Sequence, residues 1–259
     1  MELSSASRDP TERFSTRVDD YVRYRPGYPA ALVDHLRAHG WLSVHSVVAD
    51  IGAGTGISSA LFLDAGCSVH AVEPNAPMRA AAQRLLGRHE RFHAVDGRAE
   101  HTTLADASVD LIAAGTAFHW FERIPTQAEF ARILRPGGHI ALFWNLRART
   151  AGFMRDYEDI LLAQCPGYAE ADASRRADEH SVREFFGSGF VERAAFANAQ
   201  RFAFEGLLGR VLSSSYAPQP GAAAHAPLRL ALRDLFERCA VDGQVTLAYD
   251  TVLYVGEAA

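Results

Sequence analysis

Three glycines at alternate positions give the clearest sign of chemistry in the chain. A short apolar run that contains Asp50 leads directly into Gly52, Gly54 and Gly56. Glycine lets a backbone approach a polar ligand where any Cβ would collide. The helix expected over residues 57–64 would point its first N–H groups and its positive dipole end at that ligand. This stretch therefore predicts a turn that binds a nucleotide-type ligand.

The glycine spacing bears on which nucleotide the turn holds. A dinucleotide fingerprint requires G-x-G-x-x-G, whose third glycine allows close packing of helix on strand beneath a pyrophosphate. Here the third glycine comes one residue early, and Ile57 stands where that fingerprint needs Gly or Ala. Glu73 follows the next apolar segment, where a carboxylate can accept both hydroxyls of a ribose. The pattern predicts an adenosine-containing ligand and disfavours a dinucleotide, although Glu73 by itself does not separate the two.

His119 is the candidate general base, because it follows the fourth expected strand at the sheet edge where open α/β folds bind ligands. A base is needed only where the proton of the reacting group must leave early, as for a phenol or an alcohol. The alternative is that the imidazole hydrogen-bonds the backbone and shapes the pocket. The aromatic residues expected to line a substrate cavity are Phe118, Trp120, Trp144 and Tyr216.

A dense aromatic and cationic segment, Tyr-Arg-Pro-Gly-Tyr-Pro, occupies residues 24–29. Its two prolines and its glycine predict a turn between two helices. The segment is interpreted either as a packed helix corner or as a lid whose Tyr24, Arg25 and Tyr28 face the ligand. Arg25 or Arg147 would then be available to pair with a carboxylate of the substrate.

Residues 89–93 spell H-E-x-x-H, a zinc-binding pattern that requires both histidines on one face of a continuous helix. Gly87 is expected to end the preceding helix, and residues 91–95 are expected to form a strand. We therefore predict no zinc site there, and no metal site elsewhere in the chain.

Apolar periodicity predicts strands that alternate with helices over the first 145 residues. Strands are expected at residues 47–51, 67–73, 91–95, 109–114 and 139–144, helices at 29–39, 57–64, 76–86 and 125–134, and a tight turn at 135–138. This alternation implies a parallel sheet with helices on both faces, joined by right-handed crossovers. Further along, helices are expected over about 147–184, 205–214 and 227–239, and strands over about 191–204 and 245–255.

Composition excludes several classes of protein. The 259 residues are 48% hydrophobic, which is enough for a sizeable core. A net charge of −5, with no block of basic residues, disfavours a nucleic-acid partner. Cys67, Cys165 and Cys239 are isolated, which indicates neither a disulfide framework nor a zinc knuckle. With no leader and no long apolar run, we expect a cytoplasmic protein with no membrane contact.

Four motifs together resemble those of the class I S-adenosylmethionine-dependent methyltransferases. They are the segment at residues 24–29, Asp-x-Gly-x-Gly-x-Gly at 50–56, Ala-Phe-His-Trp-Phe at 117–121 and Arg-Pro-Gly-Gly at 135–138. Over about residues 12–259 the chain is similar to the methyltransferase type 11 group, in particular to proteins like trans-aconitate methyltransferase. The resemblance implies an α/β fold with a Rossmann-like, seven-stranded, mostly parallel sheet. Its strand order would be 3-2-1-4-5-7-6, with strand seven antiparallel, helices on both faces and a helical lid.

The resemblance also implies the cofactor S-adenosyl-L-methionine, with S-adenosyl-L-homocysteine as the product. Asp50 and the glycine turn would hold the methionine end, and Glu73 the ribose. The residues expected to bind the cofactor are Asp50, Gly52, Gly54, Gly56, Glu73, Pro74, Ala99, Glu100, Thr116, Ala117, Tyr24 and Arg25. The residues expected in the substrate pocket are Tyr28, Phe118, Trp120, Trp144, Asn145, Arg147 and Tyr216.

The turn after the third strand would lie beneath the adenine ring in such a protein. Arg98 stands where the family commonly has an aspartate. The candidates that remain for adenine are Ala99 with its backbone, and Glu100 or Asp96.

The whole chain, residues 1–259, is expected to form one methyltransferase domain. Its parts would be lid helices over 12–40, a cofactor-binding core over 41–145, a helical insertion over 146–190 and a C-terminal part over 191–259 that completes the sheet and the pocket. The leading hypothesis is in-line methyl transfer to an oxygen, nitrogen or carboxylate of a small-molecule acceptor, by a monomer or homodimer. The alternatives are a non-catalytic protein that binds the methyl donor and an NAD-dependent oxidoreductase.

Overall fold

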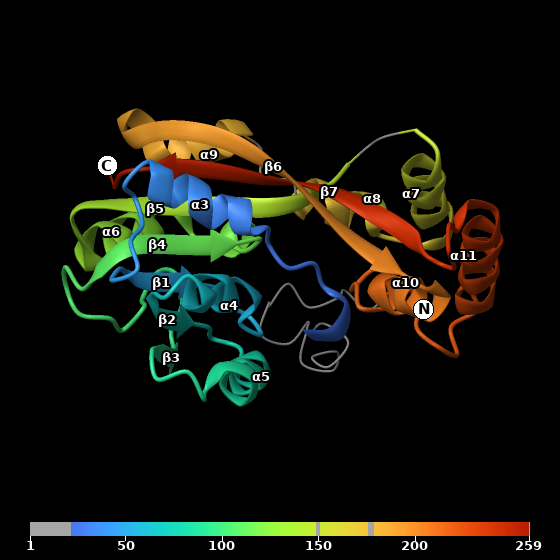
Figure 1. The fold of residues 1–259 in the computed structure, drawn as a ribbon, viewed down its shortest axis with the longest axis horizontal. Coiled ribbons are helices and arrows are strands. Elements are labelled where there is room, and N and C mark those ends of the chain that lie inside the picture. Colours follow the sequence, from blue (N-terminus) through green and yellow to red (C-terminus); the bar gives the residue numbers. More distant parts are fainter. Residues whose placement is uncertain (1–21, 149–150, 176–178, 259) are drawn as a thin grey trace, which may run out of the picture.

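A single seven-stranded sheet organises the computed structural model, which describes residues 22–148, 151–175 and 179–258 (Figure 1). Its strand order is β3-β2-β1-β4-β5-β7-β6. The first five strands pair in parallel, and β7 runs antiparallel to both β5 and β6. The strands are β1 (Val47–Ile51), β2 (Ser68–Val72), β3 (Phe92–Val95), β4 (Val109–Gly115), β5 (Leu134–Arg147), β6 (Phe190–Phe202) and β7 (Val245–Gly256). The expected fold class, strand order and direction of strand seven are confirmed.

Helices cover both faces of this sheet, as expected for alternating strands and helices (Figure 1). The helices of the first half are α3 (Ala30–Ala38), which precedes β1, and α4 (Ile57–Asp64), α5 (Ala76–Leu86) and α6 (Arg123–Ile133), with a short 3-10 turn η1 (Phe118–Trp120) after β4. Local sequence explains where they begin. For example, the Asn75 side chain caps α5 by accepting a hydrogen bond from the backbone N–H of Met78 at 3.0 Å.

The two faces of the sheet have separate cores. One core packs side chains of α3 and α4, such as Leu36 and Phe62, against Val69, Leu111 and Phe143 of the sheet. The other packs α6 and α9 (Glu179–Phe186) against the opposite face, around Phe130, Phe185 and Trp144. Each strand of the sheet centre is therefore apolar on both sides, which is why these strands read as nearly continuous apolar runs in the sequence.

A third core lies beyond the sheet centre, where the long strands β6 and β7 extend past the other five (Figure 1). The helices around it are α7 (Phe153–Gln164), α8 (Tyr168–Arg175), α10 (Phe204–Leu212) and α11 (His225–Cys239). Tyr157, Leu207, Leu232 and Leu247 are fully or almost fully buried there. This helical cluster stands next to the carboxyl ends of β1 and β4 and so forms one wall of a site at that edge. None of the helices in the described ranges is long and apolar enough to cross a membrane.

Two segments differ from the expected elements. Residues 135–138 were expected as a tight turn before strand five, but they lie within β5, where Val109 pairs with Leu134 and Leu111 pairs with His139. The pairing of β5 with β4 begins at Leu134, before the apolar run that starts near His139. The four residues in between lie opposite Asp110 alone, so the ladder is irregular there. The helical region expected over 147–184 is divided into α7, α8 and α9. The expected lid residues 12–21 lie outside the described residues.

Candidate active site

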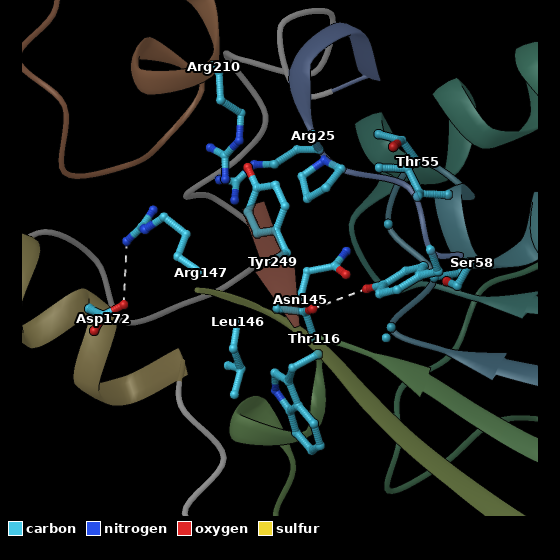
Figure 2. A pocket seen from close by; sticks show the side chains of 18 residues that line it. Arg25, Thr55, Ser58, Thr116, Asn145, Leu146, Arg147, Asp172, Arg210 and Tyr249 are labelled. Atoms are coloured by element: carbon cyan, nitrogen blue, oxygen red, sulfur yellow. Dashed lines mark hydrogen bonds and ion pairs between the residues drawn. The ribbon is translucent and has the colours of Figure 1, made fainter. Parts of the chain in front are cut away.

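A cleft that is partly open to solvent lies at the carboxyl ends of β1, β4 and β5 (Figure 2). Residues from α8 and α10 and from β7 close its other side. In an open α/β fold this edge is where ligands bind. Eight of the residues expected to bind cofactor or substrate line this cleft: Arg25, Tyr28, Gly52, Gly54, Thr116, Trp144, Asn145 and Arg147.

The glycine turn has a backbone that other residues rarely adopt. Gly52, Gly54 and Gly56 have φ angles of +69°, +58° and +88°. A Cβ at Gly52 would lie 2.6 Å from the Cβ of Ala117, and a Cβ at Gly56 would lie 2.6 Å from Leu86 Cδ1. Gly54 lines the cleft instead, and a Cβ added there would lie 3.8 Å from Met78 Sδ. Two of the glycines therefore allow close packing beneath the turn, while Gly54 keeps space open for a ligand.

Asp50 lies behind this turn and does not line the cleft. Its carboxylate is fully buried and accepts hydrogen bonds from the hydroxyls of Ser58 (2.7 Å) and Ser59 (2.6 Å), both in the first turn of α4. Burial raises the pKa of the Asp50 carboxyl from 3.8 to about 6, and the two serine hydroxyls limit the rise. Asp50 Oδ1 is buried without a hydrogen-bond partner in the structure. The residue ties β1 to α4 and leaves one oxygen available beneath the turn.

Glu73 holds the same turn from the end of β2. Glu73 Oε2 accepts a hydrogen bond from the N–H of Gly54 at 2.8 Å, and Oε1 accepts one from the N–H of Asn75 at 2.8 Å. Burial raises the pKa of the Glu73 carboxyl, and these two N–H groups act against the rise. Each oxygen retains a second lone pair, so these bonds are compatible with contact to ribose hydroxyls. Pro74 follows directly, and its carbonyl accepts from Arg79 at 3.3 Å.

The segment 24–29 is fixed against the cleft by side-chain contacts. The hydroxyl of Tyr28 lies 3.1 Å from Thr116 Oγ1, and its ring packs edge-on against Phe143. Asn145 Nδ2 donates to the carbonyl of Gly27 at 3.0 Å. Thr116 has a φ of +57°, an unusual backbone for a β-branched residue, immediately after β4. The segment thus packs as a corner and also contributes to the cleft, so the two interpretations of its role are not exclusive.

Arg147 is already neutralised by acidic side chains. Its guanidinium lies 3.4 Å from Glu158 on α7 and 3.5 Å from Asp172 on α8, and it donates to the hydroxyl of Tyr168. A longer contact of 3.5 Å reaches the hydroxyl of Tyr216. Arg147 therefore holds α7 and α8 against the end of β5 rather than presenting an uncompensated charge to the cleft.

Several other expected pocket residues pack away from the cleft. Phe118 belongs to the core around Trp144 and Phe185, with ring centroids 6.2 Å and 5.0 Å away. His119 and Trp120 share η1, and their ring centroids are 4.9 Å apart. The expected site residues that do not line the described cleft are Tyr24, Asp50, Gly56, Glu73, Pro74, Ala99, Glu100, Ala117, Phe118, His119, Trp120 and Tyr216.

The turn after β3 also lies apart from the cleft lining. Ala99 is buried, and Glu100 Oε1 accepts a hydrogen bond from the N–H of Glu122 at 2.8 Å. Asp96 pairs with Arg79 at 2.9 Å, and Arg98 forms a bridge to His101 through its backbone. These contacts fix the turn at the end of β3, next to the carboxyl end of β2 that carries Glu73.

The H-E-x-x-H pattern does not lie on one helix. Helix α5 ends at Leu86, and His93 belongs to β3, where its ring stacks on His70 with centroids 5.1 Å apart. The helical context that a zinc site of this pattern requires is therefore missing.

The most prominent site residue that sequence reasoning missed is Arg210. It is 4% exposed, lines the cleft from α10 and donates through Nη1 to Ser214 Oγ at 3.3 Å. The signal was present: an arginine stands three residues after Leu207 and next to Val211, on the buried side of an amphipathic helix. Tyr249, Asp172 and the first-turn residue Ser58 also line the cleft, and their side chains are drawn in Figure 2.

Comparison with known proteins gives a consistent result. The family described as "Methyltransferase domain" matches residues 49–142. An uncharacterized methyltransferase of Mycobacterium tuberculosis is 34% identical over 161 residues, which cover 61% of this chain and 63% of that relative. An uncharacterized methyltransferase of Schizosaccharomyces pombe is 29% identical over 200 residues, 75% of each chain. The chain therefore matches less than two thirds of the length of its mycobacterial relative.

Among solved structures, one from Anaeromyxobacter dehalogenans, described as a type II methyltransferase, has the same fold. Its TM-score is 0.68 at 23% identity, and the match covers 91% of this chain and 98% of that one. The matched residues include the glycine turn and the end of β4, both of which line the cleft. Residues 49–142 therefore match a methyltransferase domain in sequence, the curated relatives are methyltransferases, and the fold of the chain is that of this solved structure.

Proposed function

We propose that this chain binds S-adenosyl-L-methionine at the glycine turn and transfers its methyl group to a small molecule held in the same cleft. The observation that carries the proposal is the position of Gly54, which faces the cleft while Glu73 and the buried Asp50 hold its turn from behind. The room beside Gly54 is where we place the methionine end of the cofactor.

The residues present fit the cofactor. Thr55 lines the cleft, and its Oγ1 is a buried polar atom without a hydrogen-bond partner among the described residues. Buried polar atoms are nearly always hydrogen-bonded, so such atoms next to a cleft indicate a polar ligand. We assign the ribose to Glu73, the methionine end to the turn and Arg25, and the adenine to the region of Ala99 and Glu100. When bound, the cofactor supplies an electrophilic methyl group on a sulfonium.

The protein's part in such a reaction is alignment. In-line displacement at a methyl group disperses positive charge, so the enzyme gains most by holding acceptor and methyl at short distance in a water-poor pocket. Residues 41–145 would bind the cofactor, while the helices over 146–190 and the C-terminal part would close the acceptor side. Tyr28 and Thr116 stand between the two halves, where they can orient the reacting atoms.

Ligand-dependent stability tests the cofactor assignment. A ligand at 100 times its Kd stabilises a protein by about 2.7 kcal/mol, so S-adenosyl-L-homocysteine should raise the melting temperature while NAD and NADH should not. Stabilisation by NADH alone would overturn the proposal in favour of an oxidoreductase. Turnover is tested by release of S-adenosyl-L-homocysteine across a panel of metabolites. Cofactor binding with no turnover on any acceptor would favour a non-catalytic protein that binds the methyl donor.

A further inference from the structure

Arg210 is a buried cation at the acceptor side of the cleft. It lies on α10 with 4% of its surface exposed, and it lines the cleft together with Arg25, Arg147 and Tyr249 (Figure 2). Its neighbours on the helix, Leu207 and Val211, are fully buried in the third core. A charge in such a place loses most of its hydration and is costly unless another group pairs with it.

No carboxylate of the described residues lies within ion-pair distance of Arg210. Within the described ranges, the Arg210 side chain donates one hydrogen bond, to the hydroxyl of Ser214 at 3.3 Å, and its Nε is buried without a partner. The other titratable side chains close enough to influence it are the phenols of Tyr157, Tyr216 and Tyr249 and a second arginine, Arg147. Nothing in this set compensates the positive charge.

The other two arginines of the cleft are in a different situation. Arg147 has Glu158 and Asp172 as partners. Arg25 reaches the carbonyl of Ser213 at 3.3 Å and stands at the segment that approaches the glycine turn. The cofactor carries one carboxylate, which Arg25 can take. Among the described residues that line the cleft, Arg210 then remains as the arginine whose charge is matched neither by an acidic side chain nor by the cofactor.

We propose that Arg210 binds a carboxylate of the methyl acceptor, so that the acceptor is a small organic acid. The inference rests on the proposed methyl transfer and names the class of its substrate. A guanidinium presents two parallel N–H groups that match a carboxylate, and such a pair is stronger where water is excluded. The surrounding tyrosine rings and apolar side chains of the third core favour a compact acid over a polyanion such as a nucleotide.

The experiment compares acids with their neutral amides on protein saturated with S-adenosyl-L-homocysteine. The probes are acetate, benzoate and succinate, the matched acetamide, benzamide and succinamide, and inorganic phosphate as a separate anion. We expect at least one acid to bind, measured by calorimetry, at least ten times more tightly than its amide and than phosphate. Binding of phosphate in preference to every acid would overturn the carboxylate assignment, as would equal binding of acids and amides.

Variants locate the charge. Arg210→Met should abolish the preference for acids while the affinity for S-adenosyl-L-homocysteine stays within about threefold of the parent. Arg229→Met, at an exposed position of α11, is the matched control and should retain the preference. A preference that persists in Arg210→Met would refute the inference. Failure of the parent protein to bind S-adenosyl-L-homocysteine would instead refute the proposed function, so the two failures are distinct.

The melting temperature of Arg210→Met without ligand gives a second, independent readout. Replacing an unpaired buried charge by an apolar side chain of similar size is often neutral or stabilising. We therefore expect the melting temperature to stay the same or rise. A fall of several degrees would show that Arg210 serves the packing of α10, and it would contradict the assignment to a substrate.

Discussion

The backbone N–H of Gly54 donates a hydrogen bond of 2.8 Å to Glu73 Oε2, which joins the end of β2 to the turn after β1. The same carboxylate accepts from Asn75 at 2.8 Å. One buried side chain thus fixes the ligand-facing point of the glycine turn and the start of α5. The acid at the end of the second strand therefore shapes the turn in addition to its proposed contact with the ribose.

Replacing Glu73 by Gln tests this double role. Glutamine keeps one acceptor but places an amide N–H₂ against a backbone N–H, which leaves a buried donor unsatisfied at a cost of about 1–3 kcal/mol. We expect a corresponding loss of stability and S-adenosyl-L-homocysteine binding about ten- to hundredfold weaker, measured by denaturant unfolding and calorimetry. Glu237→Gln, at an exposed position of α11, should change neither. Unchanged affinity in Glu73→Gln would show that the acid is not part of the cofactor site.

Replacing Gly54 by Val should block the cleft without disrupting the core. Gly54 has a φ of +58°, and the nearest atom to an added Cβ is Met78 Sδ at 3.8 Å, so the new side chain would occupy ligand space. Residues in the left-handed region cost about 1–2 kcal/mol, which is the loss of stability we expect. Binding of S-adenosyl-L-homocysteine should fall more than hundredfold in calorimetry.

Gly243→Val controls for backbone strain in that comparison. Gly243 has a φ of +70° and no atom within 4 Å of its virtual Cβ, and it lies in the turn before β7, outside the cleft lining. It should lose similar stability and keep full affinity. If both variants lost affinity equally, the effect of Gly54→Val would be ascribed to strain and not to the ligand site.

Sequence patterns predicted the sheet and the turn because both depend on local chemistry. Short apolar runs between helical segments predicted β1 and β2. Three closely spaced glycines predicted the turn after β1, where all three have positive φ. The order of the last two strands came from the family resemblance, since pairing of β7 between β5 and β6 depends on contacts far apart in the chain.

The acceptor side was harder to predict, because it is assembled from side chains whose partners are distant in sequence. Arg147 was expected to face the substrate, yet its charge is compensated by Glu158 and Asp172 on helices that no local pattern places next to β5. Arg210 was overlooked because a single arginine in an apolar helix is commonly read as exposed. Its burial follows from packing of α10 against α11 and β7, which is a tertiary effect.

The two ion pairs of Arg147, with Glu158 and with Asp172, should contribute non-additively to the free energy of unfolding. Its side chain is 10% exposed, so one remaining carboxylate can still compensate the charge, but loss of both leaves it buried and unpaired. We expect Glu158→Gln and Asp172→Asn each to cost about 0.5–1 kcal/mol of unfolding free energy, and the double variant to exceed their sum by about 1–2 kcal/mol. Adding Arg147→Met to the double variant should recover part of the loss. Simple additivity in denaturant unfolding would show that Arg147 is solvated.

His119 should prove dispensable as a base. It lies in η1 beside Trp120 and is not among the residues that line the cleft, so we expect it to shape the wall after β4. His119→Gln should keep the shape of the dependence of turnover on pH, with any acceptor identified by release of S-adenosyl-L-homocysteine. Disappearance of a titration near neutral pH, with cofactor affinity unchanged, would instead assign the proton transfer to His119.

Asp50 should make the protein less stable as the pH rises from about 4 to about 6. Burial raises the pKa of its carboxyl from 3.8 to about 6, so the folded state binds the proton more tightly than the unfolded state does. The resulting stabilisation is fully present below the unfolded pKa and is lost as the pH rises through the folded one, a change on the order of 3 kcal/mol.

The variant Asp50→Asn tests this dependence, because its side chain cannot titrate and can still accept hydrogen bonds from Ser58 and Ser59. The unfolding free energy of Asp50→Asn minus that of the parent, in which other carboxyl groups cancel, should therefore increase over this pH range and level off above it. A difference independent of pH would mean that Asp50 is hydrated or paired in solution, and would weaken its assignment as the buried anchor of the turn.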